Sequence, residues 1–356
     1  MLRVLYIGMR YDYGDSRRGD CYEYVNFLDT LNKMAGVEVT HFPFDLVLRE
    51  QGRTGMNRRL LETVDTVKPD VCFFVLFTDE IAHETIERIS RSGNVRTVNW
   101  FTDDHWRFES YARYWAPVFH FVTTTDATAV EKYRKHGIQA VIHTQWGFNS
   151  FRYRAQGIPC DGNVSFVGQV HSHRGDLVRR LESAGIRPSC WGRGWSNGRL
   201  PFDEMVKLFS RSAISLNFSE SSVAIGWKPL AKVVLNRRAD GSLHLHGLRR
   251  MKDNAATLFS HHQRQIKGRV FEIPGAGGFL LTEVARDLER YFVPGQEIVT
   301  FGTPAEMVDK VRYYLAHDDE RERIRAAGHA RAVREHSYVQ RFLDIFQRMG
   351  VYDKIQ

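Results

Sequence analysis

The chain has 356 residues, of which 43% are hydrophobic, 12% aromatic and 26% charged. This composition is typical of a globular protein of about two domains and excludes the disordered and fibrous classes. No apolar run reaches the ~18 residues of a membrane span, MLRVLYIGM does not have the pattern of a signal peptide, and the four scattered cysteines form neither a disulfide nor a zinc pattern, so we expect a cytoplasmic protein.

The formal net charge of +8 is concentrated in one segment. Residues 226–270 contain ten Lys or Arg and two acids, a surplus equal to that of the whole chain. Such a segment attracts phosphorylated ligands, nucleic acid or anionic lipid. A solvated surface loop is the alternative that the charge alone leaves open.

The first third of the chain alternates buried-strand patterns with helical patterns. Strands are expected at 2–9, 37–44, 70–77, 96–101 and 118–125, and helices at 21–34, 58–67 and 83–92. Continuous apolar strands alternating with helices predict a parallel sheet that is covered on both faces. We therefore expect a Rossmann-like domain over residues 1–150.

A second cycle follows the irregular connector 145–162, which we interpret as a hinge. Strands are expected at 163–169, 214–218 and 278–282, and helices at 175–185, 202–213, 304–316, 319–335 and 338–347. These elements predict a second Rossmann-like domain over residues 151–336. Residues 223–262 interrupt it without a clear helix, although PLAKVVLNRR and GSLHLHGL could pair as a hairpin, and residues 337–356 are expected to return to the first domain.

Two loops of the second cycle carry candidate ligand-binding residues, because ligands bind at the carboxyl ends of parallel strands. In FVGQVHSHRGD, a strand ends at Gly168, and Gln169, His173 and Arg174 follow before a helix begins. Helix amino termini and arginines bind phosphate, so this layout suits an anion. An ordinary strand-to-helix turn has the same residues.

The second loop is QIKGRVFEIPGAGGFLLTE, residues 265–283. A short helix over 265–273 places Glu272 near Lys267 and Arg269. A nucleotide sugar would use both charges, because a carboxylate accepts from a ribose diol and cations neutralise a diphosphate, while Gly277 and Gly278 let the backbone approach closely. An exposed Arg–Glu pair beside a tight turn is the alternative.

The pattern R-x-FE-x-P-x-x-GG-F-L-L-T-E, with NWFTDDHWRF, NVSFVGQ, CWGRGWSNGR and EHSYVQRF, resembles the spore-maturation-protein-like (CgeB-like) glycosyltransferases. The resemblance implies a GT-B fold, two Rossmann-like domains facing across a cleft, and metal-independent, retaining transfer from a nucleotide-diphosphate sugar. It places Glu272 on the ribose, Gln169 and Arg174 on the diphosphate, and Trp191 beside the base. The superfamily's first motif acid falls on Arg264, so that acid is absent or displaced to Glu220.

A third loop, NWFTDDHWRFES, follows a strand of the first domain. Asp103, Asp104 and His105 could position or deprotonate an acceptor hydroxyl. The two acids could instead cap the following helix. An adjacent acid pair is also compatible with Mg²⁺ or Mn²⁺, but the resemblance implies that no metal and no cofactor besides the donor sugar is needed.

The sequence therefore predicts a glycosyltransferase that moves a sugar from a nucleotide sugar to an acceptor hydroxyl. A nucleotide-sugar epimerase and a non-catalytic bilobed binder are the alternatives, since fold alone does not decide function. Acceptors compatible with the basic segment are a glycan, a lipid-linked or phosphate-rich polymer at a membrane surface, and modified DNA.

Overall fold

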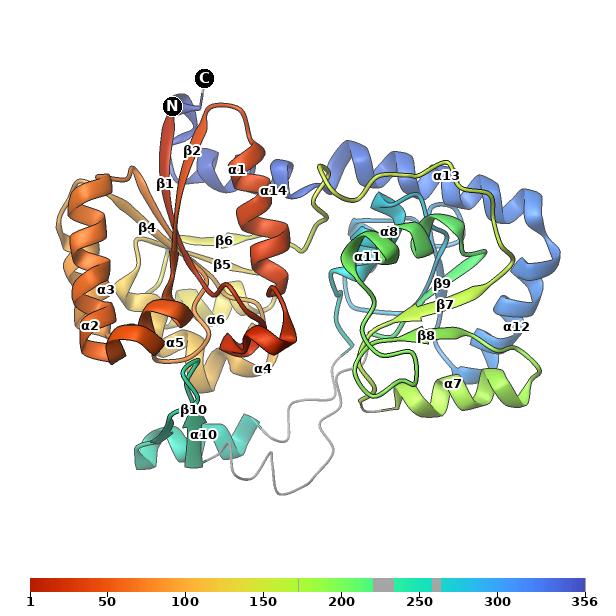
Figure 1. The fold of residues 1–356 in the computed structure, drawn as a ribbon, viewed down its shortest axis with the longest axis horizontal. Helices are drawn as coiled ribbons and strands as arrows, with labels where there is room; N and C mark the ends of the chain where they lie inside the picture. Colours follow the sequence, from red (N-terminus) through yellow and green to blue (C-terminus); the bar gives the residue numbers. More distant parts are fainter. Residues whose placement is uncertain (172, 220–233, 258–263, 356) are drawn as a thin grey trace. The chain divides into compact units, whose positions relative to one another are not determined.

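The computed structural model describes residues 1–171, 173–219, 234–257 and 264–355, which form two compact units (Figure 1). Of these residues, the first unit comprises 1–145, 234–257 and 339–355. The second comprises 146–171, 173–219 and 264–338. Each unit is built around one parallel sheet, so the predicted α/β class with two doubly wound sheets is confirmed.

The first sheet has the strand order β2-β1-β3-β4-β5-β6, and every pairing is parallel. Its strands are β1 (Leu2–Gly8), β2 (Val37–Pro43), β3 (Val71–Phe74), β4 (Arg96–Trp100), β5 (Phe121–Thr124) and β6 (Val141–His143). The helices of this unit are α1 (Asp29–Lys33), α2 (Phe44–Val67), α3 (His83–Arg91), α4 (Asp104–Arg107), α5 (Arg113–Trp115), α6 (Ala129–Lys135), α10 (Leu248–Thr257) and α14 (Tyr338–Arg348), with π-helical turns at Tyr24–Leu28 and Phe108–Ala112.

Helices cover both faces of this sheet, because successive strand residues point to opposite sides. Cys72 and Phe74 of β3 pack in one core with side chains of α2 and α3. Phe73, between them, packs edge-on against Phe342 of α14, at a ring-centroid distance of 5.6 Å. Since neither face is left to solvent, the strands are apolar along their whole length, as in other parallel sheets.

The second sheet has the order β13-β12-β9-β7-β8 and is also parallel. Its strands are β7 (Val164–Val167), β8 (Ser189–Trp191), β9 (Ile214–Asn217), β12 (Leu280–Glu283) and β13 (Val299–Phe301). The helices of this unit are α7 (Arg174–Ser183), α8 (Phe202–Arg211), α11 (Arg269–Gly275), α12 (Pro304–Ala316) and α13 (Asp318–Glu335). Side chains of α7 and α12 form one core with the sheet, and those of α8 and α11 form another.

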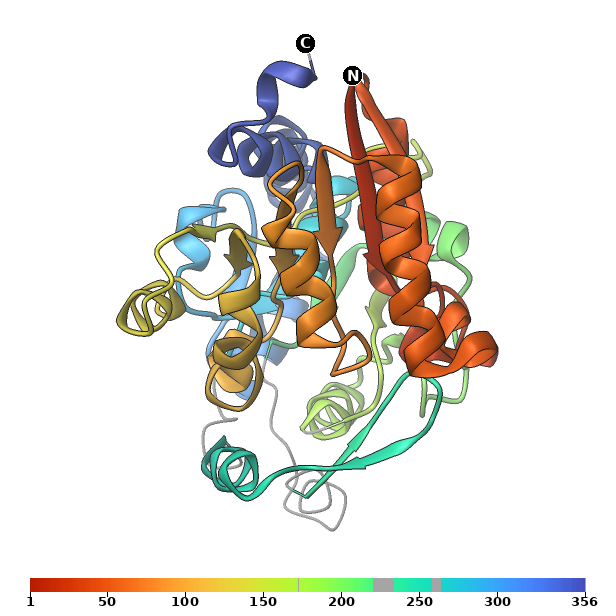
Figure 2. The same cartoon turned by 90° about the vertical axis from the view of Figure 1, so that its left-hand side faces the viewer.

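Residues 234–257 of the basic segment pack on the first unit, although they interrupt the second in sequence. β10 (Leu235–Arg237) and β11 (Leu243–Leu245) form the predicted hairpin, and α10 follows it (Figures 1 and 2). We call residues 234–257 the arm. Arg238 donates to both carboxylate oxygens of Asp79, at 3.1 and 2.8 Å, and Asp253 pairs with Arg113 at 2.6 Å. Within the described residues, no helix has the length and apolarity to cross a membrane.

Three helices illustrate where the structure departs from the sequence expectation. α2 begins at Phe44 rather than at residue 58, because Gly52 takes a φ of 65° and interrupts the helical period inside it. The helix expected at 265–273 begins at Arg269. α10 was not predicted at all, since its sequence LRRMKDNAAT has few apolar residues with which to show a buried face.

Candidate functional site

The loops after β7 and β8 contact each other at the carboxyl edge of the second sheet. The amide of Gly168 donates to the Trp191 carbonyl at 2.8 Å, and the Trp195 indole donates to the Gly168 carbonyl at 2.8 Å. Gly192 has a φ of 128°, and a Cβ there would lie 2.3 Å from the Gly168 oxygen. Glycine is therefore required at position 192 for the two loops to approach this closely.

Arg174, at the start of α7, lies across this edge. It donates to the carbonyls of Gln169 at 3.1 Å and Phe218 at 3.2 Å. Its Nε is buried and has no hydrogen-bond partner among the described residues. Burial, with a further contribution from the positive charge of Arg269, lowers the pKa of Arg174 to about 10. A guanidinium that has lost its water in this way would be stabilised by an anion.

Lys267 and His171 lie near Arg174, and Lys267 adds a second positive charge there. Burial lowers the pKa of His171 to about 4, and the neighbouring cations Arg174 and Lys267 lower it further. The imidazole is therefore neutral at physiological pH and can share a proton without adding charge. We call His171, Arg174, Lys267 and Arg269 the basic cluster.

Glu283, the last residue of β12, connects two of the loops at this edge. It is 3% exposed, it accepts from His173 Nε2 at 3.0 Å, and it accepts from the amide of Ser219 at 2.6 Å. The carboxylate thus fixes the residue before α7 and the end of the β9 loop. Sequence reasoning missed Glu283, although a charged residue that closes the apolar run FLLT was a visible signal.

Glu272 lies in α11, inside the second unit rather than on its surface. The side chain is fully buried, one oxygen is paired with Arg269, and Oε1 has no hydrogen-bond partner among the described residues. Arg269 in turn donates from Nε to the carbonyl of Val167, at the end of β7, at 3.4 Å. The interpretation as an exposed ion pair is therefore wrong, and the carboxylate belongs to the same edge as the basic cluster.

Other residues of the predicted donor site have different positions. Gln169 is exposed and contributes its carbonyl to Arg174, and Trp191 is half-buried at the end of β8. Gly277 and Gly278 precede β12, so they lie at the amino edge of the sheet, opposite the basic cluster. A Cβ at Gly278 would lie 2.6 Å from the Phe209 carbonyl, so these glycines allow a tight turn. The expected contact of Gly277 and Gly278 with the diphosphate is therefore corrected. Glu220 lies outside the described residues.

In the first unit, two of the three residues predicted for the acceptor are in the core. Asp104 is 1% exposed and accepts from the Tyr133 hydroxyl at 2.9 Å, and His105 is 6% exposed. Burial raises the pKa of Asp104 to about 7, against the opposing hydrogen bonds from Thr124 and Tyr133. Asp104 is thus held in the core by hydrogen bonds and its expected contact with an acceptor is corrected, whereas the contact expected of His105 stays a prediction.

Asp103 is partly exposed at the carboxyl edge of the first sheet, and its side chain makes no capping hydrogen bond to α4. Its charge acts on Glu23, whose pKa is raised to about 7, chiefly by burial and also by Asp12 and Asp103. A carboxyl with a pKa near neutrality can take and return a proton, which suits a general base. Glu23 was missed because it falls within a helical pattern.

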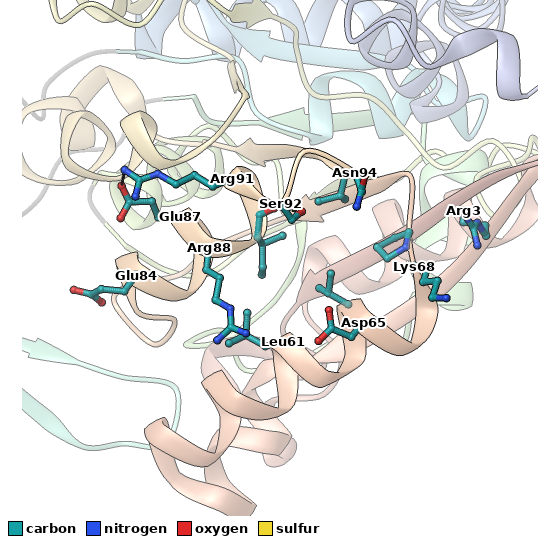
Figure 3. A pocket seen from close by; sticks show the side chains of 14 residues that line it. Arg3, Leu61, Asp65, Lys68, Glu84, Glu87, Arg88, Arg91, Ser92 and Asn94 are labelled. Atoms are coloured by element: carbon teal, nitrogen blue, oxygen red, sulfur yellow. Dashed lines mark hydrogen bonds and ion pairs between the residues drawn. The ribbon is translucent and has the colours of Figure 1, made fainter.

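The first unit also has a groove of about 810 Å³ between α2 and α3 (Figure 3). It is lined by Arg3, Lys68 and Asn94, which precede or begin strands, and by Asp65 and Arg88 of the facing helices. It therefore lies at the amino edge of the sheet. Ligands of doubly wound sheets bind at the opposite edge, so we assign neither donor nor acceptor to it.

Among residues 1–171, 173–219, 234–257 and 264–355, no three His, Cys, Asp or Glu side chains are placed to hold a metal ion.

Known proteins resemble the chain in sequence and in fold. Residues 174–347 match a family model described as glycosyl transferase-like. The sequence matches no curated protein.

Three solved structures cover nearly the whole chain. HepE from Anabaena, in complex with UDP and glucose, is 9% identical with a TM-score of 0.60, over 98% of this chain and 100% of its own. Sucrose-phosphate synthase from Thermosynechococcus elongatus is 9% identical with a TM-score of 0.62, over 98% of each chain. A glycosyltransferase from Rickettsia africae is 9% identical with a TM-score of 0.57, over 99% of this chain and 98% of its own.

At this identity the solved structures establish the fold. The chain has the GT-B architecture of two Rossmann-like units, and the match of its residues 174–347 adds support for glycosyltransferase activity.

Proposed function

We propose that the protein is a glycosyltransferase of the spore-maturation-protein-like group, which binds a nucleotide-diphosphate sugar at the carboxyl edge of its second sheet. The observation that carries the proposal is the buried carboxylate of Glu272, whose Oε1 has no hydrogen-bond partner among the described residues. A buried acceptor without a donor is costly, so the site is suited to a ligand hydroxyl. The ribose of a nucleotide offers two adjacent hydroxyls.

The basic cluster supplies the second half of donor recognition. Arg174, Lys267 and Arg269 are the cations that would bind the diphosphate, beside the loop that begins at Gly168. The backbone of Gly168 itself is occupied by Trp191 and Trp195, so Gly168 would shape the loop rather than contact the phosphates. As the glycosidic bond breaks, negative charge grows on the departing nucleotide, and fixed cations stabilise that charge without reorganisation. Glu283 would act as a positioning residue, because it holds His173 beside the cluster.

Acceptor binding is assigned to the first unit. Asp103, which is partly exposed at the carboxyl edge of the first sheet, would position the acceptor hydroxyl, and the neighbouring, partly exposed Glu23, whose pKa burial raises to about 7, would receive its proton. We propose retaining, metal-independent transfer, following the sequence resemblance.

Calorimetric titration with UDP and UDP-glucose tests donor binding, since the solved structures of HepE contain these ligands. We expect binding, and we expect the Kd of the variant Arg174→Gln to rise by about tenfold to a hundredfold, because charged hydrogen bonds contribute about 1.5–3 kcal/mol each. Arg179→Gln is the matched control, since Arg179 is an exposed arginine on the same helix, paired with Asp176. Equal affinities for both variants would remove Arg174 from the site.

The reaction class is then read from the products of incubation with UDP-glucose. Release of UDP that depends on an added acceptor supports transfer, whereas an isomerised but intact donor indicates an epimerase. Binding without turnover under all acceptors would indicate a nucleotide-sugar sensor.

A further inference from the structure

The arm exposes three leucines that pack on no core. Leu243 and Leu245 of β11 are 66% and 63% exposed, and Leu248, at the start of α10, is 86% exposed. Leu243 and Leu245 are two residues apart on one strand, so they share a face of the hairpin. Single exposed leucines are ordinary, but three within six residues are a local concentration of exposed apolar side chains.

The arm is attached firmly to the first unit by other residues, so these leucines are not needed for its anchoring. At the hairpin turn, Arg238 pairs with Asp79, and the amide of Ala239 donates to the buried carboxylate of Glu80 at 3.1 Å. On α10, Asp253 accepts from Arg113 and from the Tyr114 hydroxyl, at 2.6 and 2.5 Å. The anchors hold the arm at the carboxyl edge of the first sheet, since Asp79 and Glu80 follow β3.

The same anchors leave the arm positively charged. Of its two acids, Asp253 is neutralised by Arg113, and Asp240 accepts from the amide of Ser242 in the hairpin turn. Of its cations, Arg238 forms an ion pair with Asp79. The other cations of the arm in the sequence are Arg237, Arg249, Arg250 and Lys252, which stand before and after the leucines and outnumber the charge that Asp240 keeps.

We propose that the arm is a docking surface for an anionic phospholipid bilayer, with the three leucines inserted among the lipid headgroups and the surrounding cations on the lipid phosphates. Apolar residues bordered by Lys and Arg are the composition of segments that lie in a membrane interface. Each basic residue near such a surface adds to its attraction, which salt weakens. A protein partner is less favoured, because leucine is under-represented at the binding hot spots of protein interfaces.

Vesicle sedimentation of the full chain tests this inference. The probes are vesicles of phosphatidylcholine alone and of phosphatidylcholine mixed with phosphatidylglycerol. We expect binding to the mixed vesicles only, weakening as salt is added. In the variant with Leu243, Leu245 and Leu248 replaced by Ser, we expect the partition coefficient to fall by about a hundredfold.

The matched control replaces three exposed valines of the second unit, Val284, Val293 and Val333, by Ser. These are 40%, 41% and 52% exposed, so the control also removes solvent-exposed apolar surface. Melting temperatures of both variants show that they fold. Lys252→Glu should weaken vesicle binding, and Arg187→Glu on the second unit should not.

Two outcomes would overturn the proposal. One is the absence of wild-type binding to mixed vesicles, with or without retention on duplex DNA, which would assign the arm to a different partner. The other is equal binding by the leucine variant and the valine control, which would place the membrane contact elsewhere on the protein. Neither outcome bears on donor binding, which calorimetry measures in the absence of lipid.

Discussion

The substitution Glu272→Gln distinguishes a role of this side chain in donor binding from a role in the stability of the fold. The amide has the shape of the carboxylate and keeps its one oxygen for Arg269, but it presents an NH₂ group, which donates, where Oε1 now lies. In the unliganded protein, Oε1 has no hydrogen-bond partner among the described residues. The wild type therefore already contains an unfavourable buried group in this state.

The expected magnitudes follow from this geometry. A hydrogen bond from a ligand hydroxyl to a charged acceptor contributes about 1.5–3 kcal/mol, so donor affinity should fall by about tenfold to a hundredfold. The free energy of unfolding should change by no more than about 1 kcal/mol, because loss of the ion pair is offset by loss of a buried charge. Arg269 is 27% exposed, so water can solvate it once its partner is neutral.

Donor titration and urea unfolding of the same preparation measure both quantities. Glu204→Gln is the control, since Glu204 forms an exposed ion pair with Lys207 three residues away in α8, the same spacing as Arg269 and Glu272. It should change neither quantity. A variant of Glu272 that loses stability while it keeps its donor affinity would refute the reasoning and make this carboxylate structural.

Three further predictions concern the first unit. The stability of Asp104→Asn relative to the wild type should increase as pH rises from ~4 to ~7. The folded wild type keeps the Asp104 proton to about pH 7, so its free energy of unfolding falls by up to roughly 4 kcal/mol over this window. If urea unfolding gives the same pH dependence for the variant and the wild type, this prediction is wrong. Gly14→Ala should weaken the attachment of the arm, because a Cβ at Gly14 would lie 2.3 Å from the Ala239 oxygen, and hydrogen exchange of the α10 amides should become faster. Gly52→Ala is the control: Gly52 also has a positive φ, but a Cβ there would have nothing within 4 Å, so the exchange rate of α10 should not change. Phe342→Ala should cost about 3–5 kcal/mol of unfolding free energy by chemical denaturation, since the ring is fully buried against Phe27, Phe73 and Trp100, and exposed Val333→Ala should cost little.

Much of the fold could be predicted from the sequence, because buried parallel strands have continuous apolar runs in the sequence. VCFF and LRVLYIG are examples, and each is a strand close to its expected bounds. Elements without that signal were harder to predict. α10 is polar and is held by ion pairs with residues more than a hundred positions away, such as Arg113, which no local pattern reveals.

The candidate site shows the same division. Arg174 and Glu272 could be nominated, because a loop after a strand and a family motif indicated them. Glu283 was missed although it closes an apolar run, because its partner His173 is 110 positions away. Glu23 could not be nominated, since its pKa reflects burial beside Asp12 and Asp103. Asp104 was misjudged, because the sequence shows an acid in a loop but not the hydroxyl of Tyr133 that holds it inside.

The position of α14 has a consequence for how the protein is made. Phe27, Phe73 and Trp100 emerge early from the ribosome, but the ring of Phe342 that covers them is translated only after the entire second unit. During that interval one apolar face of the first sheet is incompletely covered, which exposes it to chaperones and to aggregation. Nascent chains stalled before α14 should therefore aggregate or bind chaperones, even though all strands of the first sheet are present.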